Sequence, residues 1–191
     1  MWPVWPCFWP ATMLVGSPGL PSRWTVALRR RRQEMTRRKQ HYAQLRRYFR
    51  RVPPVRMLGI RLSRLSPGRA TLILDSRPRH AHAEGVHGGI LATLADTALA
   101  MAILTLVRSP ARIATVELKI NYLSLHARGR LRAEARVLRL GKRWAVGEVD
   151  IRNTKGSLVA KSLLTYSIRP PTEKERERTA PARSSARRGR T

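Results

Sequence analysis

The chain is poor in cysteine and in aromatic side chains. Cys7 is the only cysteine among 191 residues, so neither a disulfide within the chain nor a cysteine-rich zinc site can form. This composition fits a reducing compartment, and we expect a cytoplasmic protein. Aromatic residues make up 6% of the chain. Few of them lie among the basic residues of 56–168, which argues against a platform that stacks single-stranded nucleic acid.

Acidic residues are also scarce, with 11 Asp and Glu against 39 Lys and Arg and a formal net charge of +28. Residues 1–55 carry 12 basic and 1 acidic residue, residues 169–191 carry 8 and 3, and residues 56–168 carry 19 and 7. This excess fits an arginine-rich composition with solvated tails, an anionic ligand that bears phosphate, or nucleic acid. We do not expect a nucleic-acid partner.

The composition divides the chain into four segments. Residues 1–34 combine tryptophan with proline and have no basic leader, which fits neither a signal peptide nor a membrane span. We expect them to be unstructured, and we hypothesise that Met35 is the natural start. Residues 35–55 contain a basic helix at 36–50. The main domain is 56–168, and the charged segment 169–191 is expected to be disordered.

Residues 56–168 predict an α+β domain with an antiparallel sheet. Alternating apolar and polar residues bounded by turn residues predict strands at 58–65, 69–76, 112–123, 129–140, 143–153 and 157–168. A histidine-rich loop at 77–87 precedes one apolar helix at about 88–107. That helix has no polar face, so it must be covered nearly all round. It contains Gly, Thr and Asp, so a sheet that curls around it fits better than a membrane.

The most informative motif is His87-Gly88-Gly89 with Asp96 nine residues after the histidine. After the glycine pair, Asp96 is the only ionisable residue in the apolar run that ends at Val107. Burying an unpaired carboxylate is costly or raises its pKa. Asp96 therefore has a chemical role as a base or nucleophile, or it is a structural partner of an arginine or a backbone group.

The residues around this motif resemble a known family. Gly85–Gly89 followed by Leu94–Ala98 resembles the signature of the PaaI-like thioesterases (phenylacetate-pathway type), which have the hotdog fold. The resemblance continues through Thr115–Leu123, Gly141–Val146 and Gly156–Lys161. It covers about residues 40–168 in one colinear stretch, and the combination of HGG with LADTA at this spacing is specific.

This resemblance implies an antiparallel sheet wrapped around one long central helix, in subunits that form homodimers or homotetramers. It implies hydrolysis of acyl-CoA thioesters, or of acyl carrier protein thioesters, without metal and without a cofactor, since coenzyme A is part of the substrate. The Gly88 amide would polarise the thioester carbonyl, and Asp96 would act as nucleophile or general base. Both roles fit the residues, because helix N-terminal amides suit a developing oxyanion and Gly89 also leaves the backbone accessible.

The spacing of these two groups has a further consequence. Gly88 and Asp96 are eight residues apart, which on one helix is a rise of about 12 Å. Reacting groups must lie within about 3–3.5 Å of each other. We therefore expect an active site shared between subunits, with the amide from one and the carboxylate from the other.

Other residues are candidates for substrate binding. His87 is grouped with Gly88 and Asp96 as a catalytic candidate that contacts substrate, or it only shapes the turn before the helix. Thr97, a candidate for substrate binding, is either a residue of packing or a local back-bond, or a catalytic hydroxyl. Many members of the family carry a polar residue, often Asn, six residues before the HGG histidine, where this chain has Ala81. We take His82, one residue later, as the replacement.

Two further candidates are Asn121, near the predicted pocket, and Arg143, on a basic rim that would bind the phosphates of coenzyme A. The histidines at 80, 82 and 87 have no matching cysteine or carboxylate, so no metal site is predicted. The alternative function is a hotdog module that binds acyl-CoA without turnover. The acyl chain cannot be deduced from the sequence, because single apolar residues discriminate only weakly between chain lengths.

Overall fold

The computed structural model describes residues 23–82, 85–107, 112–126 and 128–173. The chain divides into two compact units, residues 1–40 and 41–191. Helix α1 (Arg23–Phe49) begins in the first unit and ends in the second. It starts well before the predicted 36–50 and includes residues 23–34, which we expected to be unstructured. The physical reason is that residues 23–52 contain neither proline nor glycine and are rich in helix-forming arginine.

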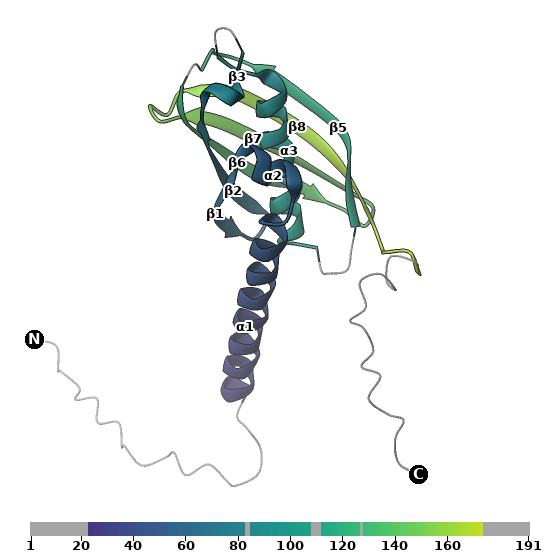
Figure 1. Ribbon diagram of the computed structural model, residues 1–191. Helices are drawn as coiled ribbons and strands as arrows, with labels where there is room; N and C mark the ends of the chain where they lie inside the picture. The colour runs from purple at the N-terminus through teal and green to yellow at the C-terminus, as the bar shows by residue number, and fades with distance from the viewer. Residues whose placement is uncertain (1–22, 83–84, 108–111, 127, 174–191) are drawn as a thin grey trace, which may run out of the picture. The chain divides into compact units, whose positions relative to one another are not determined.

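The second unit is built on one six-stranded antiparallel sheet with the order β1-β2-β6-β7-β8-β5. The sheet curves around a single long helix, α3 (Figure 1). Its strands are β1 (Arg61–Ser66), β2 (Arg69–Ser76), β5 (Arg112–Tyr122), β6 (Gly129–Leu140), β7 (Trp144–Asn153) and β8 (Leu158–Arg169). This confirms the predicted α+β architecture and all six predicted strands, each within three residues of its predicted bounds.

Helix α3 (Gly88–Leu104) lies against the inner face of the sheet. Eight of its residues are buried, among them Leu94, Ala98 and Leu99. The helix comes closest to β7 at Gly147, where an added Cβ would lie 2.3 Å from Cδ1 of Leu99 and 2.8 Å from the carbonyl oxygen of Arg136. Glycine is therefore required at this position by the close approach of helix and sheet.

Helix α3 ends three residues before the predicted end at 107. The hydroxyl of Thr105 donates to the carbonyl of Ala102 at 2.6 Å and accepts from the amide of Gly68 at 2.8 Å. The carbonyl of Ala102 also accepts from the amide of Thr105 at 3.2 Å, so the backbone and the side chain of one residue together close the last turn. The same hydroxyl ties this end of α3 to the turn between β1 and β2.

Short elements connect the main ones. Helix α2 (Pro53–Leu58) follows α1 directly, with Pro53 at its start and Gly59 at its end with φ of 67°. The sequence analysis placed no helix here, although proline favours the first position of a helix. The predicted loop 77–87 contains the 3-10 helix η1 (Pro78–His80) and the two-residue strands β3 (Ala81–His82) and β4 (Gly85–Val86).

His80 is buried below the loop from which α3 starts. Its Nδ1 accepts a hydrogen bond from the amide of Arg77 at 3.0 Å, and its carbonyl accepts from the amide of His87 at 2.9 Å. Burial, followed by the positive charges of Arg79 and Arg77, lowers the pKa of His80. The neutral ring therefore supports the turn that carries the HGG motif.

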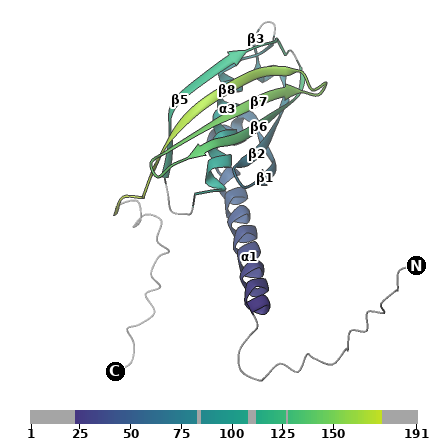
Figure 2. The same cartoon turned by 180° about the vertical axis from the view of Figure 1, so that it is seen from behind.

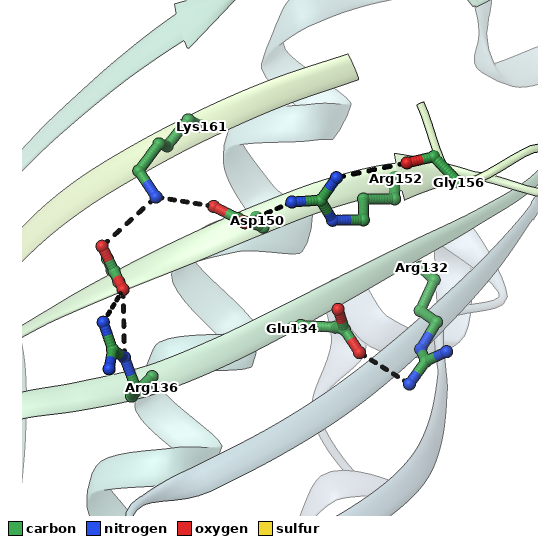
Figure 3. A network of polar contacts seen from close by, with 8 residues as sticks. Arg132, Glu134, Arg136, Asp150, Arg152, Gly156 and Lys161 are labelled. Carbon is green, nitrogen blue, oxygen red and sulfur yellow. Dashed lines mark hydrogen bonds and ion pairs between the residues drawn. The ribbon is translucent and has the colours of Figure 1, made fainter. Parts of the chain in front are cut away.

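The outer face of the sheet, seen from behind in Figure 2, is charged. Lys161 lies between Asp150 at 2.8 Å and Glu148 at 3.2 Å, and these carboxylates also pair with Arg152 and Arg136 respectively (Figure 3). Hydrogen bonds and nearby positive charges lower the pKa of Glu148. Burial would raise the pKa of Asp150, but hydrogen bonds and ion pairs with Lys161 and Arg152 outweigh burial and lower it. This face is thus a network of ion pairs.

Within the described ranges, no helix combines the length and the apolar character that a membrane crossing needs.

Candidate functional site

The HGG motif forms the start of α3. His87 is the N-cap residue, and its Nδ1 accepts a hydrogen bond from the amide of Gly89 at 3.0 Å. The amides of Ile90 and Leu91 both donate to the carbonyl of His87. In the part of the chain that the structure describes, the Gly88 amide has no acceptor. One donor of the first helical turn is therefore available to a ligand, at the positive end of the helix dipole.

Tyr122 of β5 fixes this end of the helix to the sheet. Its hydroxyl donates to the carbonyl of Gly88 at 3.0 Å. A Cβ at Gly88 would lie 3.0 Å from Cζ of Tyr122, so glycine is what allows the ring to lie against the backbone. The ring is 53% exposed, and it borders the free amide.

Asp96 lies two turns further along α3 and is partly buried. Its Oδ1 accepts hydrogen bonds from the hydroxyl of Thr115 at 2.8 Å and from that of Tyr166 at 2.5 Å. These two residues are cross-strand partners on β5 and β8. The sequence left open a chemical role for this acid or a structural partner among arginine and backbone groups. The sheet supplies two hydroxyl donors instead, which lie 19 and 70 residues away in the chain.

The carboxylate is asymmetric in its contacts. Both donors bind Oδ1, and among the described residues Oδ2 has no partner. Burial, and after it the negative charge of Asp96, raises the pKa of Tyr166. The phenol therefore stays protonated and remains a donor, while Oδ2 is free for another group.

The Gly88 amide and the Asp96 carboxylate belong to the same unbroken helix, as the sequence analysis assumed. Gly88 opens the helix and Asp96 lies eight residues later, so about 12 Å of helical rise separates them. Side-chain rotation cannot bring one thioester carbon to within about 3–3.5 Å of both. Within one chain, the amide and the carboxylate are two separate half-sites.

The structure places the other predicted residues as follows. Gly89 gives its amide to His87, which is the turn-shaping role considered for that histidine. Thr97 follows Asp96 on α3, about 100° further around the helix. Arg143 is exposed at the turn before β7, and its carbonyl accepts from the amide of Ile168 at 2.7 Å. It therefore lies at the end of the sheet where Asp96 binds β8.

Asn121 and His82 are less closely linked to these groups. Asn121 pairs in register with Lys161, whose side chain belongs to the charged outer face. Since neighbouring strand residues point to opposite faces, Asn121 lies on the face opposite to Tyr122. His82 is in β3, and its side chain lies outside the described residues. The substrate-binding roles of Asn121, His82, Thr97 and Arg143 stay predictions.

Sequence reasoning missed three residues that contact the motif: Thr115, Tyr122 and Tyr166. Thr115 and Tyr122 both fell within the family resemblance, which gave neither of them a role. Tyr166 carried no signal, because a tyrosine in a strand is ordinary. The register of β5 against β8 is what identifies the pair at Asp96.

The described ranges contain no cluster of three or more His, Cys, Asp or Glu side chains that could hold a metal ion.

Known proteins with similar sequences include thioesterases and esterases. Residues 84–160 match the profile of the Thioesterase superfamily. A Halobacterium salinarum protein, named provisionally as an esterase, is 38% identical over 100 residues, which are 49% of this chain and 66% of that protein. A Saccharolobus solfataricus protein with the same provisional name is 31% identical over 59% of this chain and 81% of its own length. The medium/long-chain acyl-CoA thioesterase YigI of Salmonella typhimurium is 27% identical over 61% of this chain and 86% of its own length.

Solved structures share the fold. A thioesterase family protein from Silicibacter pomeroyi superposes with a TM-score of 0.64 and 26% identity, covering 67% of this chain and 97% of its own. The PaaI protein of Escherichia coli, from the phenylacetic acid degradation operon, gives a TM-score of 0.65 at 23% identity, covering 70% and 96%. These matches confirm the hotdog architecture that the sequence resemblance implied.

Proposed function

This chain belongs to the thioesterase superfamily, and we propose that within it the protein hydrolyses acyl-CoA thioesters to a carboxylic acid and free coenzyme A. The relative YigI, named for this activity, supports the substrate class. The observation that carries the proposal is the pair of groups on α3. The Gly88 amide lacks an acceptor among the described residues, and the Asp96 carboxylate is held through one oxygen.

The two groups match what the reaction requires. Water attacks the acyl carbon, negative charge develops on the carbonyl oxygen, and the C–S bond breaks to release the thiol. The Gly88 amide would donate to that oxygen. Asp96 would take the proton of the attacking water, or attack the carbon itself to give an anhydride that water then opens. Coenzyme A is the leaving group, and no further cofactor is required.

The 12 Å between the half-sites leads us to propose a catalytic homodimer. A two-fold axis would place Gly88 of one subunit opposite Asp96 of the other and would create two identical sites. Among the described residues, strand β5 pairs with β8 alone, and it carries both Thr115 and Tyr122. Its other edge is the surface that we propose for a second copy.

The first test measures free thiol released from acyl-CoA thioesters of increasing chain length, with the wild type and Asp96→Asn. Asparagine keeps the shape of the side chain but is neither a base nor a strong nucleophile. We expect turnover by the wild type and a loss of about 10²- to 10⁴-fold in the variant. Turnover that survives in Asp96→Asn would refute the assigned chemistry. Binding without turnover by the wild type would favour a sensor of acyl-CoA.

A second test isolates the amide by comparing Gly88→Pro with Gly88→Ala. Position 88 is the first residue of α3, where proline is well tolerated but has no N–H to donate. Alanine adds a Cβ and keeps the N–H, so it is the matched control. Loss of one oxyanion donor should lower kcat of Gly88→Pro about 10²- to 10³-fold relative to Gly88→Ala. Equal rates for the two variants would show that the amide is not used.

The third test addresses the shared site. In a dimer of one Asp96→Asn chain and one Gly88→Pro chain, one site has both defects and the other has none. Random pairing of equal amounts would make half of the dimers mixed, so about a quarter of wild-type activity should return. Activity no higher than that of the two parents would contradict a site built from two subunits.

A further inference from the structure

Tyr166 occupies a position that the proposed reaction has not used. It lies in β8 between its register partners Thr115 on β5 and Ala145 on β7, and its side chain is 2% exposed. Its hydroxyl lies 2.5 Å from Oδ1 and 2.8 Å from the backbone oxygen of Asp96. A strand in the middle of the sheet thus contacts the carboxylate and the helix backbone that carries it.

The phenol has one proton and two acceptors within reach. An ionised carboxylate is the stronger acceptor, so the proton points to Oδ1 of Asp96. Burial and the nearby carboxylate charge raise the pKa of Tyr166, so this donor persists through the pH range of an assay. Because the ring is enclosed by the sheet, the donor is also fixed in space.

Thr115 completes the arrangement with a second hydrogen bond to the same oxygen, at 2.8 Å. An oxygen that accepts from two hydroxyls is a weaker base and nucleophile than one without a donor. Both donors come from the sheet, so they hold the carboxylate against rotation about its own axis. Oδ2 is left as the reactive oxygen.

We propose that Tyr166 is a positioning residue, which binds Oδ1 of Asp96 together with Thr115 and so directs Oδ2 toward the thioester. This rests on the proposed thioesterase function. Tyr166 touches neither water nor substrate in this scheme. It acts through Asp96, by fixing the orientation of the carboxylate.

The test compares Tyr166→Phe with the wild type in the full-length protein, using thiol release from the best acyl-CoA substrate across pH. Phenylalanine keeps the ring and removes the donor. We expect kcat to fall about tenfold to a hundredfold, the effect of losing a hydrogen bond to a charged group, with KM unchanged. The acid-side decline of kcat should begin at a higher pH, because the ionised carboxylate has lost a donor. A purely structural role would not move this decline.

Tyr42→Phe is the matched control, because Tyr42 is another partly buried tyrosine that packs against the core at α1, away from Asp96. It should leave kcat, KM and the pH profile unchanged. Thr115→Val removes the other donor to Oδ1 at an exposed position, so it tests the same arrangement if Tyr166→Phe does not fold. It should shift the acid-side decline in the same direction, whereas Thr115→Ser should restore the wild-type profile.

The outcomes separate this inference from the proposed function. If the wild type hydrolyses acyl-CoA and folded Tyr166→Phe matches it in kcat and pH profile, the positioning role is wrong and the function stands. If Tyr166→Phe fails to fold and Thr115→Val leaves the profile unchanged, the positioning role is also wrong. No turnover by the wild type on any thioester would overturn both.

Discussion

The contact between Gly88 and Tyr122 predicts that Gly88→Ala changes the free energy of unfolding in opposite directions with and without the Tyr122 ring. An alanine Cβ at position 88 would lie 3.0 Å from Cζ and 3.1 Å from the hydroxyl oxygen of Tyr122. Ordinary contacts between carbon atoms are about 3.5–4.0 Å, so the ring must retreat by a few tenths of an ångström. That movement also strains or breaks the 3.0 Å hydrogen bond from the Tyr122 hydroxyl to the Gly88 carbonyl.

Three contributions set the size of the effect. Overpacking costs about 1–3 kcal/mol, and the lower part of that range applies because the ring is 53% exposed and can turn toward solvent. The weakened hydrogen bond adds about 0.5–1 kcal/mol. Against these, alanine is favoured over glycine in a helix by at most about 1 kcal/mol. Gly88→Ala should therefore destabilise the protein by about 1–2 kcal/mol.

The sign should reverse once the ring is removed. In a Tyr122→Ala background neither the overlap nor the hydrogen bond exists, and only the helix preference of alanine remains. Gly88→Ala should then be neutral or stabilising by up to about 1 kcal/mol. Urea unfolding of the four proteins at one fixed protein concentration measures the coupling. An equal loss of unfolding free energy in both backgrounds would refute the proposed contact.

Three further predictions concern the packing and charge of the domain. Gly147→Ala should lower the free energy of unfolding by about 3 kcal/mol, because its Cβ would lie 2.3 Å from Leu99. A loss below about 1 kcal/mol in urea unfolding would contradict that close approach. The lowered pKa of His80 implies that stability is full above about pH 6.5 and falls below it, since the unfolded chain gains the proton first. His80→Gln should flatten this slope in thermal unfolding, and an unchanged slope would exclude His80 as its source. Lys161→Met should cost at most about 1 kcal/mol at pH 7, because the Lys161 side chain is 46% exposed and solvent screens its ion pairs. That loss should vanish at a pH where the carboxylates are protonated, and a loss that persists there would assign the effect to packing.

The elements of the domain could be predicted because their signals are local. Residues 69–76 alternate along the strand, and the buried members Ala70, Leu72 and Leu74 face the helix. The apolar segment after Gly89 has no polar face, so other elements must cover it on all sides. This requirement predicted the curved sheet. The start of α1 was missed because a basic segment gives no apolar periodicity, although nothing in it breaks a helix.

Part of the site could be predicted because its sequence signals are also local. The HGG turn and Asp96 lie within ten residues, so their order along one helix could be read directly. The hydrogen-bond donors to Asp96 could not be predicted from the sequence, because the register of β5 against β8 is what brings Thr115 and Tyr166 together. A slip of β5 against β8 by one residue would turn the Thr115 hydroxyl to the outer face and separate it from Tyr166.

The two half-sites are fixed by different means, and this is the physical argument for the proposed second subunit. The Gly88 amide is placed by the start of α3 and by Tyr122, whereas the Asp96 carboxylate is held by strands β5 and β8. A rigid helix keeps the two apart, so no loop movement within one chain can close the distance. The two-fold axis of the proposed dimer would close it without any movement, because it would pair the start of one helix with the middle of the other. The rigidity of the helix separates the two groups in one chain. In the dimer it would hold the amide and the carboxylate of each site at a fixed distance.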